Sequence, residues 1–397
     1  MNNILNNIIY LDNAATAKPN EQALNEFNRI EKNFWGNPSS LHEMGFLAEE
    51  EIKKAKKTIA KKLNANINSV YFTSGGTESN NTAILGAVKK TKHIGKHIVT
   101  TQFEHSSVLN PIKKLESEGY SVTYLSPESK GYISREQILN AVKKDTCLVS
   151  VMAVNNETGA LNEVFGILKD IKKISPDCFF HSDCIQAFLK VGNILKAEDF
   201  DLISVSGHKI GAVKGIGALI VNKEIPPLLL GGGQQKGMRS GTVPAGLICS
   251  FAKAAEVFGK NTNAENTVNN GCKETKSFDY INHINHIYNY CLEQLKSHNY
   301  HINYIGPTSK YIINFSVKNI KSETMLHFLE SKGIYVSSGS ACSKGKKSNV
   351  LKALNLSDDY IDSALRISFC NETAKEDIDK LILSLEEAEK VLVKIKR

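Results

Sequence analysis

Residues 70–87 read VYFTSGGTESNNTAILGA, a short apolar run that passes through a glycine turn into a segment of helical composition. A strand that leads through a tight turn into a helix is the building unit of α/β proteins. Such a turn directs backbone N–H groups, here with the hydroxyl of Thr77, toward an anion. The segment therefore indicates a phosphate site at Gly76 and Thr77, although an ordinary turn with a helix cap has the same composition.

The same alternation of apolar, β-branched runs with segments of helical period continues along most of the chain. The runs that we expect to form strands are 69–73, 97–101, 121–126, 147–154, 178–183, 201–207 and 215–221. Strands that alternate with helices predict a mostly parallel sheet covered on both faces. We therefore expect a large α/β domain over residues 18–260.

The remaining residues, 1–17 and 261–397, are expected to form a smaller α+β domain. An Asn-rich polar stretch over about 260–275 reads as a surface loop or domain junction. The last helix should open with Thr373 and Glu376, which have capping-box spacing.

The composition is that of an ordinary globular protein and argues against a membrane-spanning, a secreted or a nucleic-acid-binding protein. The 397 residues are 41% hydrophobic and 23% charged, with no apolar run of the roughly 18 residues that a membrane span needs. The first residues lack the basic region and apolar run of a secretory signal. Eight cysteines without a CxxC pair are typical of reduced thiols, and a spread net charge of +8 is weak evidence for nucleic-acid binding. We expect a cytoplasmic protein with neither membrane nor direct nucleic-acid partners.

Two further strand ends carry residues of catalytic type. Asp183 ends the apolar run in HSDCIQ, and Lys209 follows a later run in SVSGHKI. Ligands of α/β sheets bind at such strand ends, and a lysine beside an apolar wall can lose its proton and act as a nucleophile. A phosphate cradle, an acid and a lysine are the protein groups needed to hold pyridoxal phosphate. Taken alone, each residue also fits a strand-end cap or a lysine that extends to solvent.

A metal site is the competing interpretation of the same region, because Cys178, His181 and Cys184 lie close together in the sequence. Alternation along a strand puts His181 on the opposite face from Cys178. The three side chains therefore have poor geometry for one ion, and we predict no metal site.

Longer motifs indicate a family. In chain order they are YLDNAATAKP, NPSSLHEMG, TSGGTESNN, EHSSVL, VNNETG, HSDCIQ, SGHKI, KGIGALIV, GGGQQKGMRSGT, SSGSAC and LRIS. With these motifs the chain resembles the pyridoxal-phosphate cysteine desulfurases of the nitrogenase-accessory and iron–sulfur-cluster type, within the class V aminotransferases. The resemblance covers nearly the whole chain and implies the aspartate aminotransferase-like fold (fold type I) of PLP-dependent transferases.

The resemblance also implies roles for individual residues. Lys209 would bind the cofactor covalently and move protons, Asp183 would pair with the pyridine N–H, and His105 would stack on the ring. The phenolic oxygen would be bound by Asn156 and Gln186. The phosphate would be bound by Gly76, Thr77, Ser206 and His208. Thr242 would reach the phosphate of a neighbouring subunit, which implies a homodimer.

Two residues in the C-terminal part would act on the substrate. Cys342 would be the nucleophile, and the nearby Lys344, Lys346 and Lys347 would favour its thiolate. Arg366 would pair with the substrate carboxylate, with a structural salt bridge as the other interpretation. The implied reaction converts L-cysteine to L-alanine and leaves a persulfide on the enzyme. The sulfur would then pass to an acceptor protein for iron–sulfur cluster assembly or for thiolation of tRNA or a cofactor.

Two other functions fit the same motifs. A selenocysteine lyase has the same fold and cofactor site, and a sulfur-carrier or assembly component would depend on a partner protein for turnover. The chain also departs from the family pattern, since it carries Cys370 and Asn371 where many members have Gly-Arg. These differences leave the identity of the sulfur acceptor open.

Overall fold

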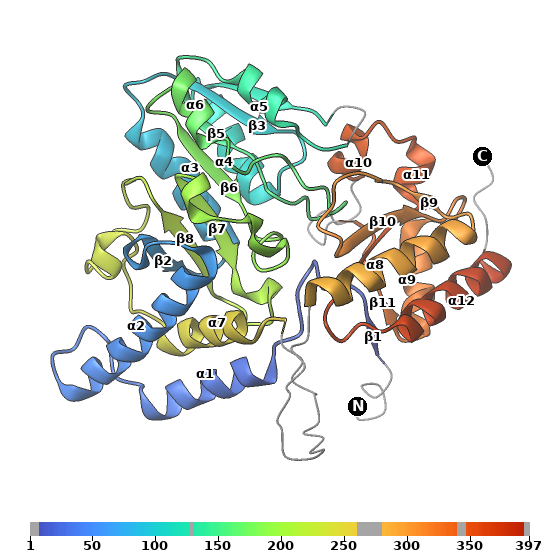
Figure 1. Cartoon of the computed structure of the whole chain (residues 1–397), viewed down its shortest axis with the longest axis horizontal. Coiled ribbons are helices and arrows are strands. Elements are labelled where there is room, and N and C mark those ends of the chain that lie inside the picture. The colour runs from blue at the N-terminus through green and yellow to red at the C-terminus, as the bar shows by residue number, and fades with distance from the viewer. Residues whose placement is uncertain (1–7, 128–130, 260–279, 340–346, 393–397) are drawn as a thin grey trace.

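The computed structural model describes residues 8–127, 131–259, 280–339 and 347–392. In Figure 1 the blue to yellow segments gather around one sheet, and most of the orange to red segments gather around a second, smaller one. The boundaries expected for two domains, at residues 17 and 260, stay predictions.

A seven-stranded sheet forms the larger part of the structure, in the order β2-β8-β7-β6-β5-β3-β4. Its strands are β2 (Val70–Thr73), β3 (His97–Thr101), β4 (Ser121–Leu125), β5 (Thr146–Ser150), β6 (Phe179–Asp183), β7 (Leu202–Ser206) and β8 (Gly217–Val221). The strands from β3 to β7 pair in parallel, whereas β8 runs antiparallel to both β7 and β2. Each predicted run overlaps one of these strands, so the prediction of a mostly parallel sheet is confirmed.

Helices cover both faces of this sheet, because consecutive strand residues point to opposite sides. Ile98 and Leu148 belong to the hydrophobic cluster that includes α3 and α4, whereas Val99 and Val149 belong to the cluster that includes α1, α2 and α7. The helices of this part are α1 (Glu21–Asn33), α2 (Glu43–Leu63), α3 (Gly76–Lys90), α4 (Ser106–Ser117), α5 (Arg135–Ala141), α6 (Leu168–Ile174) and α7 (Ala245–Val257).

The smaller part has its own hydrophobic cluster, which also takes in Ile9 and Leu11 of the N-terminal segment. Its strands are β1 (Ile9–Tyr10), β9 (His301–Ile302), β10 (Ile312–Ser316), β11 (Ile334–Tyr335) and β12 (Ala364–Ser368). β10 is the centre of an antiparallel sheet between β12 and β9, and β1 pairs in parallel with β11. The helices are α8 (Tyr280–Ser297), α9 (Ser322–Ser331), α10 (Asn349–Ala353), α11 (Asp358–Asp362) and α12 (Lys375–Val391).

The predicted start of the last helix is wrong by one residue. The backbone N–H of Ala374 donates to Asp377 Oδ2 at 2.9 Å, so the capping pair is Ala374 and Asp377. Thr373 is engaged in the preceding turn, where its hydroxyl accepts a hydrogen bond from the backbone N–H of Cys370 at 3.0 Å. A threonine whose oxygen closes one turn is not available to cap the next.

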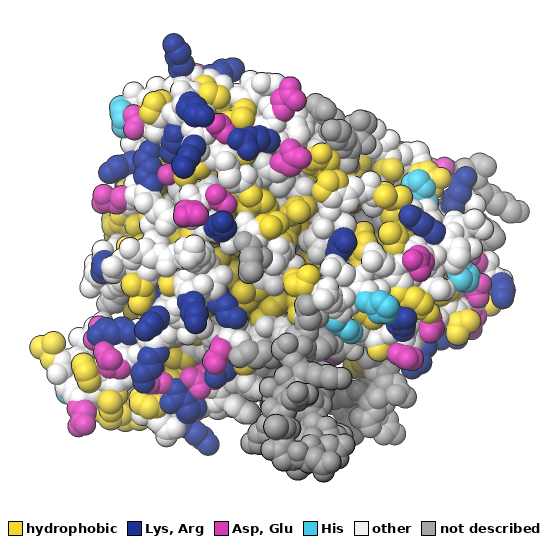
Figure 2. All heavy atoms as spheres, viewed as in Figure 1, with side chains coloured by type: hydrophobic (Ala, Val, Ile, Leu, Met, Phe, Trp, Pro, Cys, Tyr) yellow, Lys and Arg dark blue, Asp and Glu magenta, His cyan; other side chains and the backbone are white. Residues whose placement is uncertain are grey.

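Charged side chains of both signs are mixed over one face of the molecule. On the face shown in Figure 2, Lys and Arg are interspersed with Asp and Glu rather than gathered into one basic region. Within the described ranges, no helix has the length and apolar character needed to cross a membrane.

Candidate functional site

A cavity of about 250 Å³ lies where the carboxyl ends of β6 and β7 meet the start of α3. Its walls include Gly76, Thr77, His105, Asn156, Asp183, Gln186, Ser206, His208, Lys209 and Arg366. These are residues singled out in the sequence, and the structure brings them to one place. They come from both parts of the molecule, because Arg366 lies on β12 of the smaller sheet.

Asp183 ends β6 and lies inside the protein, with 5% of its surface exposed. Its Oδ1 accepts a hydrogen bond from the backbone N–H of Ile185 at 3.0 Å, and its Oδ2 accepts one from Asn80 Nδ2 at 2.7 Å. Burial raises the pKa of Asp183. These bonds fix the carboxyl group against the cavity wall. Asn80 was not predicted, although it lies one helical turn after Gly76 in the segment that decides the fold.

Lys209 follows β7 at the end of a short 3₁₀ turn, Gly207–Lys209. Its Nζ donates to the carbonyl oxygens of Ala14 and Ala15 at 2.7 and 2.6 Å. Those two residues belong to the N-terminal segment, whose Ala14 N–H in turn donates to Ser368 Oγ at 2.7 Å. The lysine is therefore held at the junction of the two parts of the molecule.

His105 precedes α4 and contacts the first turn of that helix. Its Nδ1 accepts a hydrogen bond from the backbone N–H of Ser107 at 3.2 Å and lies 2.7 Å from Ser107 Oγ. Burial lowers the pKa of His105, which favours a neutral ring. A neutral imidazole can lie against a planar aromatic group without the cost of burying a charge.

The opposite end of the cavity is suited to an anion. α3 has Gly75 at its N-cap with φ of +151° and no side-chain cap, which leaves backbone N–H groups of its first turn available. A Cβ added at Gly76 would overlap Ile185 Cδ1. Ser206 Oγ is buried without a hydrogen-bond partner among the described residues. An open helix start, a close glycine and an unpaired hydroxyl are the features of a phosphate cradle.

His208 borders the same end of the cavity. Its Nδ1 lies 3.2 Å from Thr16 Oγ1. Burial, followed by the charge of Lys209, lowers the pKa of His208 to about 4. The ring is therefore neutral at physiological pH and can donate one N–H to a ligand.

Arg366 is almost completely buried, with 2% of its surface exposed. Its Nη2 pairs with Asp12 Oδ1 at 2.6 Å, and its Nη1 donates to the carbonyl oxygen of Asn156 at 2.9 Å. Among the described residues Nε has no partner. The salt bridge allowed for in the sequence is thus present, and the guanidinium nevertheless borders the cavity, with three of its five N–H donors outside these two contacts.

Two of the predicted residues in the described part of the chain, Thr242 and Lys347, do not line the cavity. Thr242 is exposed, and its expected contact with a neighbouring subunit stays a prediction. Cys342 lies outside the described residues. Lys347, expected to favour the Cys342 thiolate, pairs with Asp358 at 3.0 Å and with Asp362 at 3.3 Å. The two aspartates take up the charge of Lys347, so it offers less support to a thiolate than an unpaired lysine would.

The residues weighed as metal ligands are occupied by other contacts. Nδ1 of His181 lies 2.9 Å from Ser150 Oγ, and Nε2 lies 3.0 Å from Ser204 Oγ. Cys178 and Cys184 are buried free thiols. Across the part of the chain that the structure describes, no group of three His, Cys, Asp or Glu side chains could hold a metal ion.

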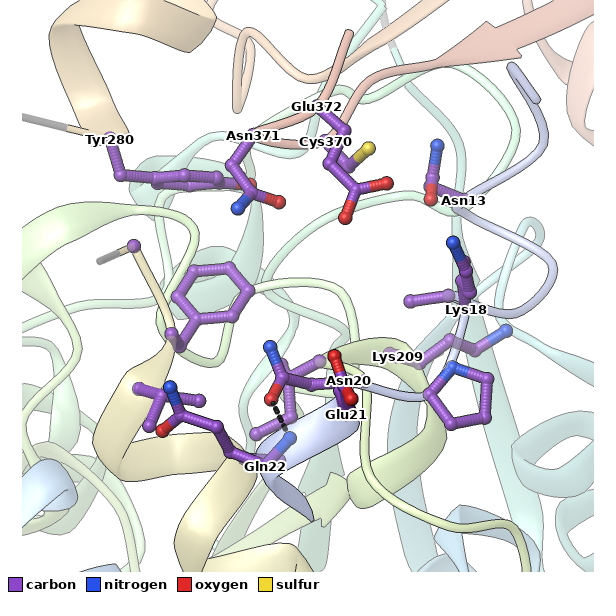
Figure 3. A pocket seen from close by; sticks show the side chains of 18 of the residues that line it. Asn13, Lys18, Asn20, Glu21, Gln22, Lys209, Tyr280, Cys370, Asn371 and Glu372 are labelled. Atoms are coloured by element: carbon purple, nitrogen blue, oxygen red, sulfur yellow. Dashed lines mark hydrogen bonds between the residues drawn. The ribbon is translucent and has the colours of Figure 1, made fainter. Parts of the chain in front are cut away.

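A second cavity, of about 580 Å³, adjoins the first and is shown in Figure 3. Lys209 borders both cavities. The second one lies between the start of α1, the end of α7 and the segment that carries Cys370 and Asn371. Lys190 and Tyr311 line this second cavity and not the first.

Comparisons with known proteins agree with this geometry. The family model described as aminotransferase class-V matches residues 9–381. A NifS/IcsS protein homologue of Lactobacillus delbrueckii subsp. bulgaricus is 36% identical over 388 residues, which cover 96% of this chain and 97% of the relative. The cysteine desulfurase IscS of Rickettsia bellii is 37% identical over 402 residues, covering 97% of this chain and 93% of the relative.

Solved structures give the same result. A NifS-like protein superposes with a TM-score of 0.85 at 28% identity, covering 97% of this chain and all 100% of the other. The structure titled SspA in complex with cysteine has a TM-score of 0.75 at 31% identity, covering 92% of this chain and 100% of the other. These matches confirm the predicted fold of the PLP-dependent transferases. With its motifs, its fold and a family match over most of its length, the chain belongs to the class V aminotransferase family.

Proposed function

We propose that the protein is a pyridoxal-phosphate-dependent cysteine desulfurase, which converts L-cysteine to L-alanine and passes the sulfur to its own Cys342. The observation that carries the proposal is the buried cavity in which Lys209 and Asp183 lie together with the open start of α3. The names of the relatives support it, since one is called cysteine desulfurase IscS and a neighbouring structure is described as a complex with cysteine.

The residues present fit the proposed cofactor at both of its ends. Ser206 Oγ is a buried hydroxyl without a partner among the described residues, beside the start of α3, and it would donate to the phosphate. Asp183 would face the pyridine nitrogen, held in place by Asn80. Burial alone raises the pKa of Asp183, and a cationic ring nitrogen beside it would lower that pKa again, so that the acid stays ionised.

The cofactor supplies an electron-withdrawing ring that stabilises negative charge on the substrate Cα. Lys209 would be the group that removes and returns protons there, because it is the lysine that borders the cavity. Its contacts with the carbonyl oxygens of Ala14 and Ala15 hold the amine at the cavity wall. Asn156 and Gln186 would bind the phenolic oxygen, and His105 would lie against the ring.

Sulfur transfer requires a carboxylate anchor and a thiolate. Arg366 would anchor the substrate carboxylate with N–H groups that its contacts with Asp12 and Asn156 leave available. The Cys342 thiolate would attack the substrate sulfur, so that the bond between the substrate Cβ and sulfur breaks and a sulfur–sulfur bond forms. L-Cysteine and the enzyme thiol thus give L-alanine and an enzyme persulfide, with no other oxidant or reductant.

We further propose that the active unit is a homodimer that hands its sulfur to an acceptor protein of iron–sulfur cluster assembly or of thiolation. Large apolar side chains are exposed between α1 and α2, with Trp35 at 69% and Leu41 at 105%, and in the loop before Thr242, with Leu230 at 82%. Apolar groups of this size in loops favour contact with another protein surface. The cytoplasmic location stays a prediction.

An absorption spectrum of the purified protein with added pyridoxal phosphate, followed by an assay for alanine and sulfide, tests the function. We expect a bound-cofactor band and formation of alanine from L-cysteine. Lys209→Ala should abolish turnover and the covalent cofactor label after borohydride reduction, whereas Lys196→Ala, at an exposed position, should change neither.

Two results would contradict the proposal. Wild-type protein that gains no band with the cofactor would overturn the cofactor assignment. A band with turnover of selenocysteine but not of cysteine would instead favour a selenocysteine lyase.

A further inference from the structure

Gln186, which we expect to bind the phenolic oxygen of the cofactor, has an amide group whose orientation can be read from its partners. One end of the amide lies 2.9 Å from the carbonyl oxygen of Ala14. A carbonyl oxygen only accepts hydrogen bonds, so that end is the amino group, Nε2. The other end is the oxygen, Oε1, and it accepts a hydrogen bond from the hydroxyl of Tyr311.

Tyr311 is itself oriented by a lysine. Lys190 Nζ donates to Tyr311 Oη at 2.9 Å and lies 3.4 Å from Gln186 Oε1. It also lies over the tyrosine ring, 4.2 Å from the ring centroid. Because Tyr311 Oη accepts from the lysine, its own proton is directed to Gln186. The three side chains form a hydrogen-bond chain of fixed direction, from Lys190 through Tyr311 to Gln186.

The three side chains of this hydrogen-bond chain are unusually deeply buried. Lys190 is 5% exposed, Tyr311 is 1% exposed and Gln186 is 4% exposed. Among the described residues no carboxylate pairs with Lys190. Burial, together with the charge of Lys209, lowers the pKa of Lys190 well below its usual value. Burial of a lysine without an acid costs free energy, and the hydrogen bond to Tyr311 offsets part of that cost.

The hydrogen-bond chain also joins the two parts of the molecule. Gln186 and Lys190 lie in the segment after β6, on the larger sheet, whereas Tyr311 directly precedes β10 of the smaller one. Neither Lys190 nor Tyr311 lines the cavity that we assign to the cofactor. The charge of Lys190 also acts on Lys209 and His208, but that effect does not depend on the phenolic oxygen of the cofactor. An effect confined to the phenolic oxygen must pass through Gln186.

We infer that Tyr311 is a positioning residue for the cofactor, which with Lys190 holds the oxygen of the Gln186 amide away from the cavity. One N–H of Gln186 Nε2 donates to the carbonyl oxygen of Ala14, and the second N–H is left to donate to the phenolic oxygen of the cofactor. The inference rests on the proposed function and adds to it a residue outside the cavity.

The experiment compares two ligands that differ only at the phenolic oxygen. Apoprotein is titrated with pyridoxal phosphate and with 3-deoxypyridoxal phosphate, and both dissociation constants are measured for wild type and for Tyr311→Phe. Because one hydrogen bond contributes about 0.5–1.5 kcal/mol, we expect Tyr311→Phe to weaken pyridoxal phosphate binding by roughly 2- to 12-fold. Binding of the deoxy analogue should be unchanged.

Two further variants complete the test. Lys190→Met replaces the lysine with an apolar side chain of similar length and removes the donor to Tyr311, so it should weaken binding of pyridoxal phosphate more than binding of the deoxy analogue. Any effect of the lost charge on Lys209 and His208 should be common to both ligands. Tyr300→Phe is the matched control, because Tyr300 is also buried and donates to Glu389 Oε2 at 3.1 Å, on α12. We expect it to change neither dissociation constant.

Each result separates the inference from the proposed function. Equal weakening of both ligands in Tyr311→Phe and Lys190→Met would mean that the chain only supports the fold, which overturns the inference. So would variants that bind both ligands like wild type. If the wild type itself gains no cofactor band, the proposed function fails, and the inference fails with it.

Discussion

Arg366 has two partners within the protein, so its substitution must distinguish a structural role from binding of the substrate carboxylate. It pairs with Asp12 at 2.6 Å and reaches the carbonyl oxygen of Asn156 at 2.9 Å. If it also binds the substrate carboxylate, Arg366→Ala removes a charge-assisted interaction of about 1.5–3 kcal/mol. We then expect the KM for L-cysteine to rise about 10- to 150-fold while the cofactor band is retained.

Asp12→Asn is the control for this prediction, because it removes the salt bridge and keeps the guanidinium. It should lower thermal stability and leave the KM close to that of wild type. If Arg366→Ala and Asp12→Asn raise the KM equally, the arginine serves only to hold the N-terminal segment in place.

Among single residues, those that belong to motifs could be predicted from the sequence, whereas the residues that hydrogen-bond to them could not. Asp183 and Lys209 stand at the ends of apolar runs, where the sequence itself marks them. Asn80 bonds Asp183 only because α3 lies against β6, and Tyr311 bonds Gln186 only because the residue before β10 reaches the segment after β6. Such contacts join residues more than a hundred positions apart, and periodicity along the chain carries no information about them.

Among the elements, the positions of the strands were predicted better than the residue at which the last helix begins. A buried parallel strand is a continuous apolar run and is visible in the sequence. The capping box of α12 was misplaced by one residue, because the Thr373 hydroxyl closes the turn at Cys370 and the N-cap falls on Ala374. Ala374 has no side-chain acceptor, so composition favours Thr373 as the N-cap and only the backbone turn shifts the start of the helix. The antiparallel direction of β8 also follows from its short connection to β7 and not from its composition.

His181 ties three strands of the large sheet together, since it lies on β6 and bonds Ser150 on β5 and Ser204 on β7. Burial lowers its pKa to about 3. The folded protein therefore excludes a proton that the unfolded chain binds below about pH 6.5, so stability contributed by this residue falls as the pH drops from 6.5 toward 3. Between pH 7 and pH 5 the loss should be about 2 kcal/mol.

Urea unfolding of wild type and His181→Gln at pH 7 and pH 5 measures this effect. His181→Gln should lower the free energy of unfolding at pH 7 but make it less dependent on pH, by about 2 kcal/mol over this interval. An equal pH dependence in wild type and His181→Gln would show that His181 binds its proton equally well in the folded and the unfolded protein, which contradicts the lowered pKa.

Over the whole molecule, the distribution of thiols bears on where a persulfide can form. Five of the described cysteines are buried: Cys147, Cys178, Cys184, Cys249 and Cys291. Burial raises the pKa of Cys147 to about 11 and the pKa of Cys178 and Cys249 to about 12. It also raises the pKa of the partly buried Cys370. At neutral pH these thiols are poor nucleophiles, because the reactive species is the thiolate.

Because the thiols of the described part of the chain are poor nucleophiles, the remaining candidates for sulfur transfer are Cys272 and Cys342. Both lie outside the described residues. We expect intact-mass analysis after a short exposure to L-cysteine to show one added sulfur atom per chain, and peptide mapping to place it on Cys342. Cys342→Ser should bind the cofactor as wild type does, because none of the residues proposed to bind the cofactor is changed, but should accumulate no persulfide. Cys272→Ser, the matched control, should accumulate it normally. Persulfide on Cys370 in the wild type, or its persistence in Cys342→Ser, would assign the nucleophile to another residue while leaving the cofactor site intact.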